Sequence, residues 1–161
     1  MGSRIAARGG WWAIACALLI YSSEFAFVVE TQSAPGQQQS QSLLSMYGHE
    51  ELVPLVRSFG IDAHFRRVDG RDGTSGTTGK GQYLVRHLAA LGRAVAARDD
   101  LRGRTVLIGD VPDDAAAAAE AGVRAVLYTG GAGSRRELSR VGVPVADTLA
   151  EAVSLAEQLV A

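Results

Sequence analysis

From residue 42 to the C-terminus, short apolar runs alternate with longer amphipathic runs at close intervals. The runs at 105–108 and 125–128 are apolar throughout, as in strands that are buried on both faces of a sheet. The amphipathic runs repeat their apolar residues at helical spacing, for instance at Leu52 and Val56. This alternation predicts an α/β fold, in which a Rossmann-like parallel sheet carries helices on both faces.

The expected elements place the candidate functional residues. Gly60 and Gly122 are expected to cap two of the helices, and residues 69–79 are expected to form a loop. Right-handed crossovers bring the C-terminal ends of parallel strands to one edge of the sheet, where the ligands of such folds bind. The residues that follow each strand are therefore the candidates for chemistry. We expect strands at 42–44, 63–68, 105–108, 125–128 and 143–146, and helices at 50–59, 82–97, 113–121, 135–140 and 148–160.

Composition narrows the class of protein. A chain of 161 residues suits one domain, and 47% apolar with 20% charged residues is a globular balance. The net charge of −1 gives no reason to expect a nucleic-acid partner. Cys16 is the single cysteine and the three histidines are scattered, so the sequence excludes an internal disulfide and indicates no zinc cluster.

Residues 1–41 differ from the rest, and we interpret them as an atypical apolar N-terminal segment followed by a polar linker at 31–41. Arg4 and Arg8 precede an apolar run at 11–21, which has the general form of a signal peptide but is too short to span a bilayer. We expect a cytoplasmic protein that is not bound to a membrane. The alternative is export or anchoring through residues 4–21.

Three carboxylates, those of Asp110, Asp113 and Asp114, stand within five residues directly after the apolar run at 105–108. They repel one another unless a cation lies among them, and Mg²⁺ binds one or two carboxylates together with water and phosphate oxygens. The alternative is an ordinary helix start, because Pro112 suits the first turn and the acidic residues complement the helix dipole. The sequence favours the metal site.

Two further segments could bind an anion. Ser45 and the backbone N–H of Met46 follow the run at 42–44, and Lys80 stands at the start of the helix expected after the Gly/Thr loop. The alternatives are a serine that caps a helix and an exposed lysine. The Gly-rich segment 129–134 is expected to be a plain connection.

Taken together, these segments resemble the haloacid dehalogenase-like (HAD-like) hydrolase superfamily, in particular its phosphoglycolate phosphatase-like members. The resemblance covers about residues 42–150, through Leu43-Leu44-Ser45, Lys80 and Gly109-Asp110-Val111-Pro112-Asp113-Asp114. It continues through 119–123 and 147–149. It implies a Mg²⁺-dependent phosphatase that acts on a small phosphorylated metabolite.

The resemblance also implies residue roles. Ser45, with the Met46 N–H, would bind the phosphoryl group, and Lys80 would neutralise it. Asp110 would bind Mg²⁺ directly or through water. Asp114, the second residue assigned to the metal, would hold Lys80 or the metal-bound waters, and Asp113 would only start the helix.

The family's first motif, an apolar strand followed by Asp-x-Asp that supplies the nucleophile, has no counterpart in this sequence. The nearest analogue places Glu30 and Gln32 after the apolar run 25–29, and neither side chain suits the role. We therefore assign no nucleophile, and expect a HAD-like sheet that is incomplete at its N-terminal side and a chain that is inactive alone. The alternatives are a hydrolase with an unorthodox first motif and a non-catalytic module for phosphate and Mg²⁺ binding or subunit pairing.

The missing strand would leave a gap in the centre of the sheet, with unpaired backbone groups on both sides. We expect residues 25–29, or part of 11–21, to fill that position.

Overall fold

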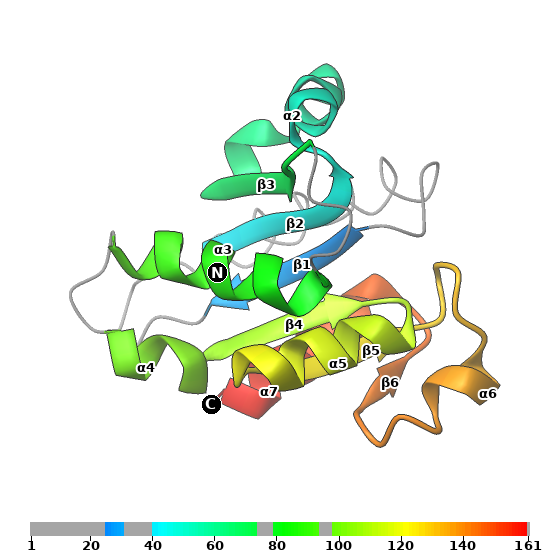
Figure 1. Ribbon diagram of the computed structural model, residues 1–161. Coiled ribbons are helices and arrows are strands. Elements are labelled where there is room, and N and C mark those ends of the chain that lie inside the picture. The colour runs from blue at the N-terminus through cyan, green and yellow to red at the C-terminus, as the bar shows by residue number, and fades with distance from the viewer. Residues whose placement is uncertain (1–24, 31–39, 74–78, 94–97, 161) are drawn as a thin grey trace, which may run out of the picture.

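The computed structural model describes residues 25–30, 40–73, 79–93 and 98–160. These residues form one six-stranded sheet in the order β3-β2-β1-β4-β5-β6 (Figure 1). The strands are β1 (Phe25–Glu30), β2 (Ser40–Gly48), β3 (Arg67–Arg71), β4 (Thr105–Gly109), β5 (Arg124–Tyr128) and β6 (Val145–Ala146). The helices are α2 (His49–Ser58), the short 3-10 turn η1 (Asp62–His64), α3 (Lys80–Arg93), α4 (Arg98–Gly103), α5 (Pro112–Ala121), α6 (Arg135–Leu138) and α7 (Leu149–Val160).

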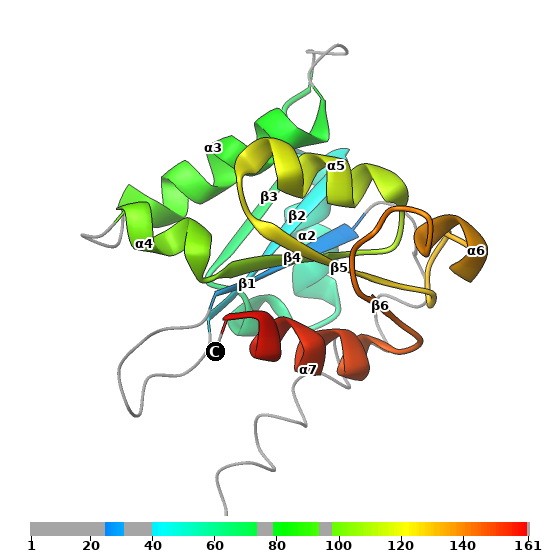
Figure 2. The same ribbon diagram turned by 90° about the horizontal axis from the view of Figure 1, so that it is seen from below.

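Helices cover both faces of the sheet, as the sequence predicts (Figure 2). On one face α3 and α5 pack against β2, β4 and β5 around Leu44, Leu84, Leu107 and Leu127. On the other face α2 and α7 pack around a second cluster that includes Leu43. The alternation of Leu43 and Leu44 between the two clusters follows from the two-residue period of a strand.

The central position of the sheet is filled by β1, which confirms the expectation for residues 25–29. β1 pairs with β2 on one side and β4 on the other, and both pairings are antiparallel. All other pairings between the described strands are parallel. The direction of β1 follows from its connection to β2, because residues 31–39 are too few for the crossover helix that a parallel neighbour requires. The alternative segment, 11–21, lies outside the described residues.

Several elements differ in their bounds from the expectation. β2 continues to Gly48 instead of ending at residue 44, with a register irregularity between Leu44 and Gly48. β3 begins at Arg67, after the short turn η1, so part of the expected 69–79 loop is strand. The helix α4 was not expected. Gly60 and Gly122 have φ of 66° and 70° after α2 and α5, as caps of this kind require.

Among the helices of the described ranges, none has both the length and the apolar character needed to cross a membrane.

Candidate functional site

The edge of the sheet at the C-terminal end of β4 gathers the site residues. Because β2 and β4 are both antiparallel to β1, they run parallel to each other. Leu43 and Ile108 both pair with Phe27 and therefore lie at one level. Ser45 and Asp110 each follow two residues later, so they reach the same edge, two strand spacings or about 10 Å apart.

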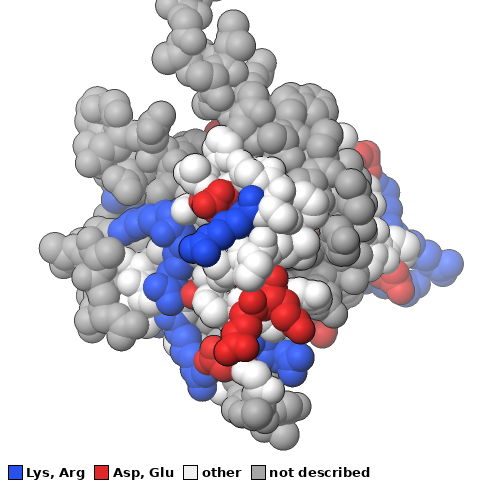
Figure 3. Space-filling view, turned by 90° about the horizontal axis from the view of Figure 1, so that it is seen from above, with Lys and Arg blue, Asp and Glu red and all other residues white. Residues whose placement is uncertain are grey.

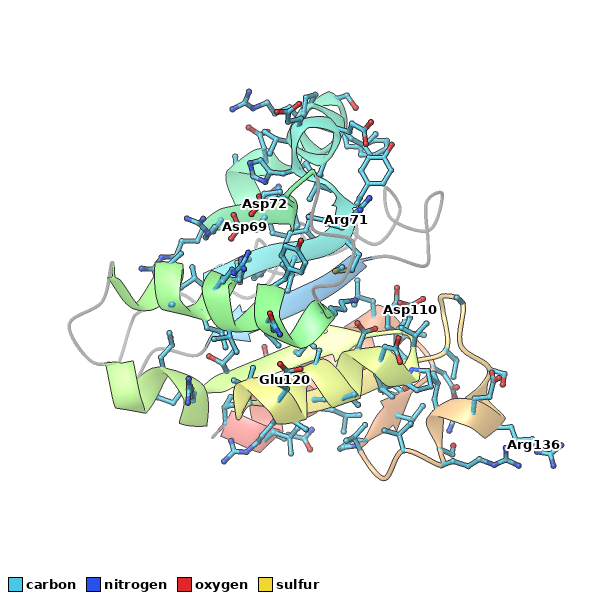
Figure 4. The ribbon with its side chains drawn as sticks, in the orientation of Figure 1. Asp69, Arg71, Asp72, Asp110, Glu120 and Arg136 are labelled. Carbon is cyan, nitrogen blue, oxygen red and sulfur yellow. The ribbon has the colours of Figure 1, made fainter. Side chains whose placement is uncertain are left out.

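Asp110 lies directly after β4, at its junction with α5 (Figure 4). Asp114 lies in the first turn of α5. Both are buried, with 3% and 0% exposure. Asp114 Oδ2 accepts hydrogen bonds from the backbone N–H groups of Asp110 at 2.9 Å and Val111 at 3.1 Å. The Asp114 carboxylate thus ties the turn after β4 to the first turn of α5, where the helix dipole favours negative charge. Asp113 is exposed in the same turn, as expected of a helix-start residue.

Lys80 joins this pair from another element. Its Nζ donates to Asp114 Oδ1, and its side chain is 11% exposed. The contact links the first residue of α3 to the first turn of α5, two helices that pack along each other. Since both Asp114 oxygens have protein partners, the geometry favours the Lys80-holding role over direct metal binding.

Two glycines let the backbone come close to these carboxylates. A Cβ on Gly109 would lie 2.2 Å from Asp114 Oδ2, and one on Gly131 would lie 1.9 Å from Asp110 Oδ2. Contacts below 3.0 Å cannot be accommodated without movement. The absence of a side chain at both positions is therefore a condition of this arrangement.

The segment after β5 contributes a contact that the sequence did not reveal. The Ala132 backbone N–H donates to Asp110 Oδ2 at 2.6 Å, and the Gly133 N–H donates to the Asp110 carbonyl at 3.0 Å. The expectation of a plain connection at 129–134 is wrong in this respect. Backbone donors carry no side-chain signature, so only the glycine content of the segment could have indicated a close approach.

The electrostatics of the site favour a cation. Burial raises the pKa of Asp110, and the neighbouring Asp114 charge raises it further, although the hydrogen bond from Ala132 acts against both. Burial, together with the charges of Asp110 and Asp114, raises the pKa of Tyr128 to about 12. Two carboxylates and one lysine leave one negative charge in excess at a buried edge, which a cation would balance.

The site offers one carboxylate that could bind Mg²⁺. Asp110 is the candidate ligand, and Mg²⁺ commonly takes one or two carboxylates and completes its shell with water and phosphate oxygens. Within the described ranges, no three His, Cys, Asp or Glu side chains are gathered where they could hold a metal ion.

Ser45 and Met46 lie within β2 and not in a turn after it. Ser45 is fully buried, and its Oγ accepts a hydrogen bond from the Tyr47 N–H at 2.9 Å. The Met46 carbonyl accepts from Arg71 Nε at 3.2 Å. Ser45 is level with Asp110, but β2 runs on to Gly48 and α2 begins directly after it, so the expected turn after residue 44 is not formed.

The chain resembles one protein family and several solved structures. The profile of the HAD-hydrolase-like family matches residues 79–152, which contain Lys80, Asp110 and Asp114. No curated protein matches the chain.

Three solved structures share its fold. A predicted phosphatase from Clostridium acetobutylicum has a TM-score of 0.59 and 16% identity, covering 71% of this chain and 49% of that one. A candidate phosphatase from Clostridium difficile has a TM-score of 0.59 and 17% identity, covering 70% and 51%. A haloacid dehalogenase-like family hydrolase from Streptococcus pneumoniae has a TM-score of 0.56 and 17% identity, covering 68% and 49%.

The chain therefore spans about half the length of the structures it matches. The family profile and the shared fold confirm the resemblance to HAD-like hydrolases that the motifs indicate.

Proposed function

We propose that this chain, which has the fold and over residues 79–152 the sequence of a HAD-like hydrolase, holds the phosphate- and Mg²⁺-binding part of a phosphatase site and does not hydrolyse esters alone. The phosphatase would be of the phosphoglycolate phosphatase type, and its ligand a small phosphorylated metabolite. The direction of β1 is the observation that carries this proposal.

The binding residues would act as follows. Lys80, fixed by Asp114, would neutralise charge on the phosphoryl oxygens. The Met46 N–H would hold them from β2, and so would the Ser45 hydroxyl once a local opening exposes it, since Ser45 is fully buried in this structure. Asp110 would bind Mg²⁺, which when present draws negative charge from the phosphate. The burial of Asp110 and Asp114 supports this assignment, because electrostatic interactions are stronger where water is excluded.

The lack of turnover would follow from the central strand. A carboxylate nucleophile in such a sheet must stand at the edge where Ser45 and Asp110 lie. Glu30 pairs with Thr105, at the opposite end of β4. It lies five residues along β1 from Phe25, or about 17 Å from the site edge. Within the described part of the chain, β1 therefore brings no carboxylate to the phosphate.

The distribution of surface charge supports a small ligand in preference to a nucleic acid. On the face seen in Figure 3, basic and acidic side chains of the described residues lie next to one another. Nucleic-acid-binding surfaces instead gather lysine and arginine into one field.

The test combines turnover with binding. Para-nitrophenyl phosphate with Mg²⁺ is expected to give no turnover, while calorimetry with inorganic phosphate and Mg²⁺ is expected to detect binding. Asp110→Asn and Lys80→Met should abolish that binding. Arg136→Met, which removes a charge from α6 far from Asp110 (Figure 4), should not change it. Turnover that Asp110→Asn removes would instead establish a working hydrolase.

The second candidate is a non-catalytic module that keeps the pocket for phosphate and Mg²⁺ binding or for pairing with another subunit. The preformed Lys80–Asp114 contact favours it, because the site is organised in the absence of a nucleophile. Phosphate binding that is unchanged when an Asp-x-Asp strand peptide is added, without any turnover, would support this candidate. Turnover that appears with the peptide would support the incomplete phosphatase.

A further inference from the structure

Three polar side chains meet on the α3 face of the sheet, away from the candidate site. His87 Nδ1 lies 2.7 Å from Asp69 Oδ2, and His87 Nε2 lies 2.7 Å from Ser42 Oγ. Asp69 comes from β3, His87 from α3 and Ser42 from β2. Arg67 Nε also donates to Asp69 Oδ2.

The three side chains contact one another in the order Asp–His–Ser, as in the catalytic triad of a serine hydrolase. Unlike in such a triad, however, the serine and the histidine are not accessible to a substrate. Ser42 and His87 are each 1% exposed, so no substrate reaches the Ser42 hydroxyl. A nucleophile must also contact its substrate. We therefore assign these three residues a structural role and not a catalytic one.

The hydrogen bonds have a defined direction. Although burial raises the pKa of Asp69, its hydrogen bonds with His87 and Arg67 hold it below the ordinary value, so the carboxylate is ionised at neutral pH. Because an ionised carboxylate can only accept, His87 Nδ1 donates to Asp69, while Nε2 at the other side of the ring is in hydrogen-bond contact with the Ser42 hydroxyl. Both ring nitrogens are satisfied only while α3 keeps one position against β2 and β3.

That position determines where Lys80 lies. His87 and Lys80 are seven residues apart on α3, which is two turns on nearly the same helix face and about 10.5 Å along the axis. Ser42 and Ser45 are three residues apart on β2, or about 10 Å. The His87–Ser42 contact at one end therefore brings Lys80 level with Ser45 at the other, where Lys80 reaches Asp114.

We propose that the Asp69–His87–Ser42 hydrogen bonds position α3 along β2, and so place Lys80 for its contact with Asp114. His87 is in this view a positioning residue for the candidate site. The inference rests on the proposed function only for the role of Lys80, since the placement itself can be measured without phosphate or turnover.

Lys80 is the only lysine of the chain, which makes the measurement direct. Acetylation of the full chain at fixed pH, followed by peptide mass mapping, gives the labelling rate of Lys80 apart from that of the N-terminal amine. His87→Leu should raise this rate about tenfold in the folded protein, because local opening exposes the amine. His87→Gln retains a donor and an acceptor near Ser42, and should stay within about twofold of the wild type.

Leu88→Ala is the matched control, since Leu88 is the next residue on α3, buried and apolar. It should lower the melting temperature without accelerating labelling. Equal acceleration in Leu88→Ala, unchanged labelling in folded His87→Leu, or labelling of His87→Gln as fast as that of His87→Leu would each overturn the proposal. If His87→Leu does not fold, Ser42→Ala is judged by the same criterion. Absence of phosphate binding in the wild type would refute the proposed function alone.

Discussion

Lys80 Nζ donates to Asp114 Oδ1 across the start of two helices, and Asp114 has no exposed surface of its own. The contact joins segments 34 residues apart and neutralises a carboxylate that also accepts two backbone hydrogen bonds. It is therefore both a structural link between α3 and α5 and the source of positive charge at the candidate site.

Lys80→Met should destabilise the protein strongly, because it leaves the buried Asp114 carboxylate without its cation. Removing one partner of a buried pair typically costs about 3–5 kcal/mol. Urea unfolding measures the change, and Lys80→Met combined with Asp114→Asn should recover part of it, because the double variant leaves no uncompensated charge. A loss below about 1 kcal/mol, the value of a surface pair, would show that water reaches Asp114.

Asp110→Asn should stabilise the protein at neutral pH while removing Mg²⁺ binding. Burial raises the pKa of Asp110, so the folded chain binds that proton more tightly than the unfolded chain does. The corresponding stability is fully present below the unfolded-chain value of 3.8 and is lost as the pH rises through the folded value. Asparagine cannot ionise, and a gain of roughly 0.5–2 kcal/mol at neutral pH is typical of such a stabilising change.

Thermal melts of the wild type and Asp110→Asn at several pH values test this prediction. The difference should shrink in acid, where the wild-type carboxyl is protonated. Added Mg²⁺ should raise the melting temperature of the wild type only. A variant that melts below the wild type at every pH would contradict the assignment.

Gly131→Ala should displace the Asp110 carboxylate, because the new Cβ would lie 1.9 Å from Oδ2. Overpacking of this kind costs about 1–3 kcal/mol. Phosphate and Mg²⁺ binding should weaken in parallel, as measured by calorimetry. Gly73→Ala is the control, since a Cβ there meets nothing within 4 Å. Equal effects of the two substitutions would refute the steric explanation.

The elements that the sequence predicts best are those that carry a strong local signal. The strands β4 and β5 and the helix α5 lie within a residue or two of their expected bounds, because continuous apolar runs and a Pro start with a Gly cap are local signals. The sequence predicts that β2 ends at residue 44, where turn-forming residues follow. The strand instead continues across an irregular stretch to Gly48, which pairs with Arg71.

Residues that contribute side chains to the candidate site could be predicted from the sequence, whereas backbone groups that contribute to it could not. The family resemblance implies that Asp114 holds Lys80 or the metal-bound waters, and the structure brings Lys80 and Asp114 into contact. The Ala132 N–H has no sequence signature. His87 was also missed, because the Asp69 carboxylate that partners it lies 18 residues away, in a segment expected to be loop.

Asp69→Asn should lower the free energy of unfolding, and the loss should be largest at neutral pH. Hydrogen bonds with His87 and Arg67 outweigh burial and keep the pKa of Asp69 low, so its contribution is present above the unfolded value of 3.8 and is lost as the pH falls through the folded value. A hydrogen bond to a charged group is worth about 1.5–3 kcal/mol. Unfolding free energies of wild type and variant from about pH 3 to pH 7 should converge in acid. A pH-independent difference would show that the charge of Asp69 contributes nothing.

The direction of β1 can be tested with engineered disulfides in a Cys16→Ser background. Antiparallel pairing sets Glu30 opposite Thr105, so Glu30→Cys with Thr105→Cys should oxidise readily, since paired Cα atoms lie about 5 Å apart. Phe25→Cys with Thr105→Cys should not, because Phe25 lies five residues away along the strand, or about 17 Å. Mass spectrometry before and after reduction distinguishes the two. A disulfide in the second pair alone would mean a parallel β1, whose C-terminal Glu30 would then stand beside Asp110, and the proposed lack of turnover would lose its structural basis.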